Sequence, residues 1–301
     1  MELWIPLTIA AAGVQAARTS LQKHLAAELS VFGATFARFL FGFPMILAGL
    51  AVLVTVTGQS VPESNCVFIA YAWVGGLVQL LGNALLLHLL TLSTFTIGTT
   101  YTKTEVIQTV GVGYVVLDEQ VGPAGFLGIL VAFFGVLLMA TGRAGLSVAS
   151  LAAALRHKPA LYGICVGALY AVAAVFYRAA ALSLDEGDFV LRAITTLAWV
   201  TTAQMLAMAV VLRLRQPGLV TKVFRAWPIG LWIGFTGIVA SACWYCAFTL
   251  QNAAYVMALG QVELVFIYIA SRFVFHERMV AQEAFGVAAT ALGILAVVLY
   301  G

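Results

Sequence analysis

Two carboxylates lie alone inside long apolar stretches of the sequence, where they could bind and release protons. Glu105 and Glu263 each fall near the middle of a stretch of about 20 apolar residues. Ionisable groups in such stretches are costly and by default mark a functional pathway. The alternative is structural, because two buried carboxylates can also fix helix packing through bonds to neighbouring backbone or arginine. Both interpretations stay open at the level of the sequence.

Polar side chains recur around Glu105 with the spacing of one helix face. The residues at i−4, i−3, i+3 and i+4 are Tyr101, Thr102, Gln108 and Thr109. We interpret this polar face as the wall of a cavity. The corresponding face around Glu263 is apolar and consists of Leu259, Gly260, Phe266 and Ile267. One polar and one apolar wall suit a ligand with a polar head and an apolar body. Gln261, two residues before Glu263, is a further candidate for the site.

Two cations in the apolar stretches are also candidates. Lys103 is two residues from Glu105, so on a regular helix it points to roughly the opposite side, and we do not expect it to pair with Glu105. It faces a neighbouring helix or extends toward the membrane surface. Arg38 lies about eight residues inside its apolar stretch, or roughly 12 Å at 1.5 Å per residue. It is therefore a candidate for a gating ion pair or a carboxylate ligand, with simple anchoring as the alternative.

The composition places all these groups in a membrane protein. Hydrophobic residues make up 63% of the 301 residues and charged residues only 9%, with a mean hydropathy of +1.04. A soluble chain carries roughly 25% charged residues, so a soluble enzyme or a nucleic-acid-binding domain is excluded. The four cysteines lie inside apolar runs and imply no disulfide framework. We expect no metal site and no cofactor.

Apolar stretches long enough to cross a bilayer account for most of the chain. A helix needs about 20 apolar residues to span the hydrocarbon core. The sequence predicts ten such spans, at residues 3–22, 30–56, 66–90, 94–117, 122–141, 159–181, 188–212, 227–250, 252–275 and 281–300. The expected fold is therefore an all-α membrane protein with ten transmembrane helices.

The sequence also contains an internal repeat. A shift of 158 residues aligns Glu105 with Glu263, Glu119 with Glu277, and two glycines of the fifth span with two of the tenth: Gly128 with Gly286 and Gly135 with Gly293. Acidic residues are scarce here, so two aligned acidic pairs favour a true duplication. We expect a first five-helix repeat at 1–142, a cytoplasmic connector at 143–158 and a second, inverted repeat at 159–301. Inverted repeats of this kind are typical of secondary transporters. Whether the glycine-lined helices meet within the chain or between protomers stays open.

The ends of the two halves resemble the EamA-type repeat of the drug/metabolite transporter superfamily. The resemblance rests on an acidic residue that closes the fourth helix of each repeat, followed by a glycine-spaced fifth helix: Glu119 with Gly128 and Gly135, and Glu277 with Gly286 and Gly293. Lys23 and Arg38 are similar to the basic pair that joins the first two helices of that family. The resemblance implies ten helices around a central cavity and export of small metabolites, and it leaves the substrate open.

The charges of the loops predict the orientation. Loops on the side of the termini hold six acidic residues and no lysine or arginine, whereas loops on the opposite side hold nine basic residues. The positive-inside rule places the basic side in the cytoplasm and both termini outside a bacterial-type inner membrane.

We therefore expect a proton-coupled secondary transporter of a small polar or amphipathic metabolite, amino-acid-like or drug-like, and not an enzyme. Its expected partners are substrate, protons and membrane lipid, without nucleic acid, in a monomer or a homodimer. The alternative is a flippase for a lipid-linked substrate or a subunit of an intramembrane enzyme. An enzyme needs a catalytic constellation, and the serines and histidines of this sequence do not cluster.

Overall fold

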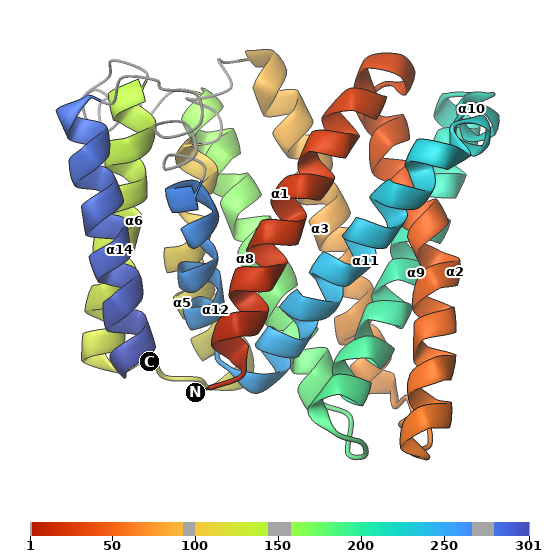
Figure 1. The fold of residues 1–301 in the computed structure, drawn as a ribbon, viewed down its shortest axis with the longest axis horizontal. Helices are drawn as coiled ribbons and strands as arrows, with labels where there is room; N and C mark the ends of the chain where they lie inside the picture. Colours follow the sequence, from red (N-terminus) through yellow and green to blue (C-terminus); the bar gives the residue numbers. More distant parts are fainter. Residues whose placement is uncertain (1, 93–99, 144–157, 267–279, 301) are drawn as a thin grey trace. The chain divides into compact units, whose positions relative to one another are not determined.

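The computed structural model describes residues 2–92, 100–143, 158–266 and 280–300 (Figure 1). Helix is the only regular secondary structure within these ranges. The all-α class predicted from the composition is therefore confirmed. Arg278 lies outside the described residues, and so does the predicted connector at 143–158 apart from its first and last residues.

The helices follow one another along the chain with short connections. Their bounds are α1 Trp4–Leu29, α2 Val31–Thr57, α3 Cys66–Leu92, α5 Glu105–Leu117, α6 Pro123–Arg143, α8 Lys158–Leu182, α9 Phe189–Arg215, α10 Leu219–Arg225, α11 Trp227–Leu250, α12 Ala253–Gly260 and α14 Ala281–Tyr300.

Seven of these helices are long and apolar enough to cross a membrane: α2, α3, α6, α8, α9, α11 and α14. They coincide with seven of the ten predicted spans. The helix of the first span, α1, has 26 residues but carries several polar and basic side chains. The fourth and ninth predicted spans lie partly outside the described residues. The total of ten transmembrane helices stays a prediction.

The chain folds into two compact units, and neither coincides with a half of the sequence. Unit 1 contains residues 1–77 and 176–250, and unit 2 contains residues 78–175 and 251–301. The helices α3 and α8 contribute to both units, because the division falls inside each of them. Each unit thus combines segments from both predicted repeats.

Unit 1 is built around α11, which packs against α1, α2 and α9 (Figure 1). Glycine lets α2 and α11 approach closely, because a Cβ atom at Gly234 would lie 2.8 Å from the backbone nitrogen of Gly42. Small residues at helix contacts are the usual means of close packing between membrane helices, where no hydrophobic driving force holds helices together.

Hydrogen bonds join two loops at one end of unit 1. The side chain of Gln59, after α2, accepts from the backbone nitrogen of Asp188 at 3.1 Å and donates to its carboxylate at 3.4 Å. Asp188 also caps α9, because its carboxylate accepts from the nitrogen of Leu191 at 2.8 Å. Asn65, before α3, donates to the carbonyl of Ser183 at 2.8 Å. These bonds fix the ends of four helices against one another.

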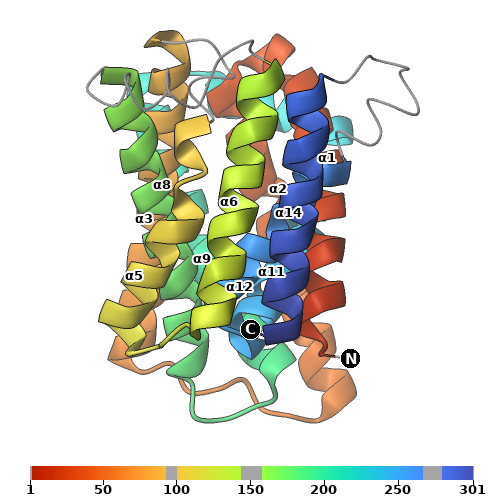
Figure 2. The same ribbon diagram turned by 90° about the vertical axis from the view of Figure 1, so that its left-hand side faces the viewer.

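Unit 2 is dominated by the contact of α6 with α14 (Figure 2). A Cβ atom at Gly286 would lie 2.7 Å from the carbonyl oxygen of Gly135, and one at Gly293 would lie 2.6 Å from that of Gly128. The two helices run antiparallel, because the residue number rises along one while it falls along the other. The glycines whose partner the sequence left open therefore meet within one chain. The 158-residue shift aligns Gly128 with Gly286 and Gly135 with Gly293, so it converts the Gly128–Gly293 contact into the Gly286–Gly135 contact. A two-fold axis between the two helices would relate the contacts in the same way.

Candidate functional site

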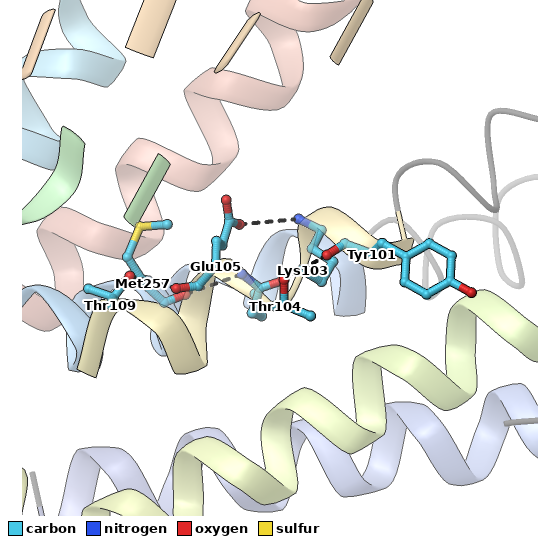
Figure 3. A network of polar contacts seen from close by, with 7 residues as sticks. Tyr101, Lys103, Thr104, Glu105, Thr109 and Met257 are labelled. Atoms are coloured by element: carbon cyan, nitrogen blue, oxygen red, sulfur yellow. Dashed lines mark hydrogen bonds and ion pairs between the residues drawn. The ribbon is translucent and has the colours of Figure 1, made fainter. Parts of the chain in front are cut away.

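The candidate site in unit 2 centres on Glu105, the first residue of α5. Its side chain is buried, and its Oε1 lies 3.9 Å from Nζ of Lys103 (Figure 3). Charged groups at hydrocarbon depth are stable only when they are paired or solvated inside the protein. The ion pair supplies part of that compensation for Glu105.

The pairing corrects the prediction that Lys103 points away from Glu105. The prediction assumed a regular helix, but residues 103 and 104 form a turn between the helical residues 100–102 and α5. The backbone is tightened there, since the nitrogen of Lys103 bonds the carbonyl of Thr100 at 3.2 Å. A bond from residue i to residue i−3 is typical of a tighter, 3₁₀-type turn. Lys103 lies in this turn and not in a regular helix, and its side chain reaches the Glu105 carboxylate.

A second interruption occurs at the corresponding position of the other predicted repeat. After α12 the chain turns at Gln261 and is helical again at 262–266. The nitrogen of Gln261 bonds the carbonyl of Ala258 at 3.2 Å, and the nitrogen of Leu264 bonds the carbonyl of Gln261. The 158-residue shift converts these two bonds into those of Lys103 with Thr100 and of Val106 with Lys103, both of which are present. Both interruptions therefore share one register.

The two interrupted helices bring their polar residues together within unit 2. The side chains of Gln261 and Glu263 both interact electrostatically with the Glu105 carboxylate. Gln261 is buried and Glu263 is half-buried. Four of the predicted site residues, Lys103, Glu105, Gln261 and Glu263, thus form one cluster, which we call the carboxylate cluster.

The remaining predicted residues of this face have local partners instead. The hydroxyl of Thr109 donates to the carbonyl of Glu105 at 2.7 Å, which is a bond within α5. The amide of Gln108 donates to Thr104 Oγ1 at 3.0 Å and to the carbonyl of Ile164 in α8 at 3.3 Å. Tyr101 is buried in an apolar contact with α8 and α6. These side chains help to fix the surroundings of the carboxylate cluster.

Helix α8 packs directly on the interrupted turn through a glycine. A Cβ atom at Gly167 would lie 3.0 Å from the carbonyl oxygen of Thr102 and 3.1 Å from the nitrogen of Glu105. Any larger residue at this position would push α8 away from the turn. The polar backbone of the turn is therefore covered by α8 and is not left facing lipid.

Arg38, the remaining predicted site residue, belongs to unit 1. Its Nη2 donates to Oγ of Ser241 in α11 at 2.9 Å, and its guanidinium carbon lies 5.1 Å from the ring centre of Phe39. Ser241 and the electrostatic neighbours Tyr177 and Tyr245 were not among the residues predicted for the site. Hydroxyl groups scattered through apolar helices give no periodic signal, so nothing in the sequence distinguished these three from packing residues.

Long apolar helices that carry buried charges define a polytopic α-helical membrane protein. Within the described ranges, no three His, Cys, Asp or Glu side chains gather in a way that could hold a metal ion. Residues 2–141 match the family model described as "EamA-like transporter family". This match confirms the family resemblance found in the sequence, over the first predicted repeat. No curated protein gives a significant match.

Similarity to solved structures extends the fold comparison to the second half. One of them, titled "Crystal structure of protein", superposes with a TM-score of 0.72 at 16% sequence identity. The superposition covers 99% of this chain and 96% of the other. At this identity the likeness establishes a shared fold only.

Proposed function

We propose that the protein is a secondary active transporter that exports a small polar or amphipathic metabolite across the inner membrane in exchange for protons. The coupling site is the carboxylate cluster of unit 2. The single observation that carries the proposal is the pairing of buried Glu105 with Lys103 while a second acid, Glu263, interacts with the same carboxylate.

Charge balance explains why such a cluster exchanges protons. With all three groups ionised, Lys103 neutralises one of the two carboxylates, so the cluster carries a net negative charge. An uncompensated charge is costly at hydrocarbon depth, by several kcal/mol in typical cases. A proton or a cationic group removes that cost when it binds. The cluster therefore binds a proton in one stage of the cycle and releases it in another, where water or substrate compensates the charge.

The paired interruptions supply the backbone for this site. Discontinuous helices near the membrane midplane are the usual construction of binding sites in secondary transporters with inverted repeats. Here both interruptions lie next to an acidic residue, Glu105 in one case and Glu263 in the other. The shared register of the interruptions and the reciprocal glycine contacts of α6 and α14 support two inverted five-helix repeats at 1–142 and 159–301.

The orientation follows from the loop charges. The basic loops face the cytoplasm and both termini face outward, in keeping with the positive-inside rule. Export direction rests on the family resemblance, because neither the carboxylate cluster nor the loop charges give the transport a direction. Alternating access then exposes the carboxylate cluster to one side at a time.

The test is proton-driven flux in proteoliposomes. A screen of labelled amino acids, nucleosides and organic cations is run with an outward or an inward pH gradient and without one. We expect at least one compound to move faster with a gradient of one sign. The double variant Glu105→Gln/Glu263→Gln keeps size and hydrogen bonding but removes titration, so its flux should no longer respond to the gradient.

The matched control is Glu63→Gln, which removes an exposed carboxylate from the loop before α3. It should keep the wild-type response to pH. A wild-type response in the double variant, made in normal amounts, would show that the carboxylates are structural and would refute the proposed coupling.

A further inference from the structure

Two arginines converge inside unit 1. A Cβ atom at Gly237 in α11 would lie 2.9 Å from Cγ of Arg38 and 3.6 Å from Cδ of Arg18. Arg18 of α1 and Arg38 of α2 therefore pass over the same point on α11, where Gly237 has no side chain to block them. Ser241, one turn further along α11, accepts a hydrogen bond from Arg38 Nη2 at 2.9 Å. We call Arg18, Arg38 and Ser241 the arginine site.

Two buried tyrosines of the same unit interact electrostatically with Arg38. The rings of Tyr177 and Tyr245 stack with their centres 4.6 Å apart. The hydroxyl of Tyr177 donates to the carbonyl of Gly75 at 3.2 Å, and both tyrosine hydroxyls interact electrostatically with Arg38. Both tyrosines are buried, whereas Arg38 retains exposed surface. A ligand would therefore meet Arg38 and not the buried tyrosines.

Depth argues against a purely anchoring role for these arginines. Arg38 is seven residues from the start of α2, and Arg18 is eleven residues from the end of α1. At 1.5 Å per residue these distances are about 10 Å and about 16 Å. Side chains that anchor a helix by extending to the surface lie near its ends.

The charges of unit 1 are segregated in a way that favours an anion here. Its acidic residues all lie in loops or in the last turn of a helix: Glu2, Glu28, Glu63, Asp185, Glu186 and Asp188. The stems of Arg18 and Arg38 meet at Gly237. An anion bound by both side chains would offset the repulsion between their two positive charges. A guanidinium pairs with a carboxylate through two parallel hydrogen bonds, which gives the contact direction as well as energy.

We propose that the arginine site binds the carboxylate group of the transported metabolite, with Arg38 as the main ligand and Arg18 and Ser241 as its partners. This proposal rests on the proposed transport function and assigns its substrate class: small organic acids, including those that also carry an amine. A carboxylate fits better than a phosphate, because it carries one charge and is cheaper to bring to hydrocarbon depth.

Direct binding to the purified full chain tests the assignment without transport. The protein is placed in nanodiscs of phosphatidylcholine, and binding of labelled benzoate is compared with that of benzamide, its neutral counterpart. We expect saturable binding of benzoate and none of benzamide. Arg38→Gln should weaken benzoate binding at least about tenfold, and Ser241→Ala about three- to tenfold, as the loss of charged and neutral hydrogen bonds predicts.

Matched controls separate this site from general charge effects. Arg213→Gln removes an exposed arginine of the same unit, and Ser183→Ala removes a loop serine. Both should bind benzoate as the wild type does. Ser241→Ala is the conservative variant that keeps the proposal testable if Arg38→Gln does not fold. Equal binding of benzoate by wild type and Ser241→Ala, or equal binding of benzoate and benzamide, would overturn the proposal.

Two further arms identify the source of any anion that binds. Phenyl phosphate should bind more weakly than benzoate, and tighter binding would assign the site to a phosphate. Nanodiscs with anionic lipid should leave benzoate binding unchanged, since loss of binding there would assign the site to a lipid headgroup. A protein that binds benzoate through Arg38 but shows no response to a pH gradient would refute the proposed coupling and leave this assignment intact.

Discussion

Nζ of Lys103 lies 3.9 Å from Oε1 of Glu105, two residues along the chain. On a regular helix these side chains would point in roughly opposite directions. The tightened turn at residues 103 and 104 removes that restriction. The ion pair therefore depends on the interruption of the helix, and any straightening of the helix would separate the charges.

Replacement of Lys103 by Met should shift the pH profile of transport. The ammonium group favours the charged form of Glu105, so its removal favours the protonated form. We expect the variant to load protons at higher pH than the wild type, with its flux maximum moved toward alkaline pH. Lys103→Arg keeps the charge and should stay near the wild-type profile. Identical pH profiles for Lys103→Met and the wild type would mean that the pair contributes nothing to proton loading.

Replacement of Gly293 by Ala should destabilise unit 2. A Cβ atom there would lie 2.6 Å from the carbonyl oxygen of Gly128, so α14 would have to move away from α6. Overpacking of this kind costs on the order of 1–3 kcal/mol. Thermal unfolding of the purified variant should show a lower midpoint.

The matched control for this packing is Gly111→Ala in α5, where nothing lies within 4 Å of the added Cβ. Alanine is the better helix former by about 0.5–1 kcal/mol, so Gly111→Ala should be neutral or slightly stabilising. If both variants lowered the midpoint equally, the close contact of α6 with α14 would not be the cause.

Cysteine labelling at the two ends of α9 should report the orientation. Acidic residues surround Glu186 at the start of this helix, and Arg213 and Arg215 lie at its end. In a background without native cysteines, a membrane-impermeant reagent added to intact cells should label Glu186→Cys and leave Gln216→Cys unlabelled. Labelling of Gln216→Cys alone would reverse the proposed orientation. Labelling of both positions after the cells are permeabilised serves as the control for accessibility.

The sequence predicted the helices better than it predicted their interruptions. Seven predicted spans reappear as long apolar helices, because length and hydropathy decide which segments can cross a bilayer. The turn at Lys103 could not be foreseen, because neither proline nor glycine marks it. Likewise, the 158-residue shift aligned Gly128 with Gly286, but only the packing of α6 on α14 showed which glycines meet.

The candidate site was predicted in part for a similar reason. Glu105 and Glu263 stood out because acids are rare in apolar stretches, and the two interact electrostatically. Ser241 and Tyr245 did not stand out, because membrane helices often contain hydroxyl groups that bond their own backbone. Only tertiary packing brings them to Arg38, and the division of the chain into units that mix both halves was not visible in the sequence.

The two acids should make different contributions when each is replaced by glutamine. Glu105 is buried and pairs with Lys103 in polar surroundings, so Glu105→Gln should weaken both substrate binding and proton coupling. Glu263 is only half-buried, and Leu259 and Phe266 of its own helix are apolar. We therefore expect Glu263→Gln to leave substrate binding near the wild-type value and to flatten the pH dependence of flux.

Measurements on one set of liposomes can separate these outcomes. Binding is measured at equilibrium with the labelled substrate found in the flux screen, and flux is measured over a range of pH for each variant. The loss of a charged hydrogen bond predicts binding weakened by about tenfold or more in Glu105→Gln. Equal losses of binding in the two variants would contradict the division of roles, because the two carboxylates would then act as one site for the substrate.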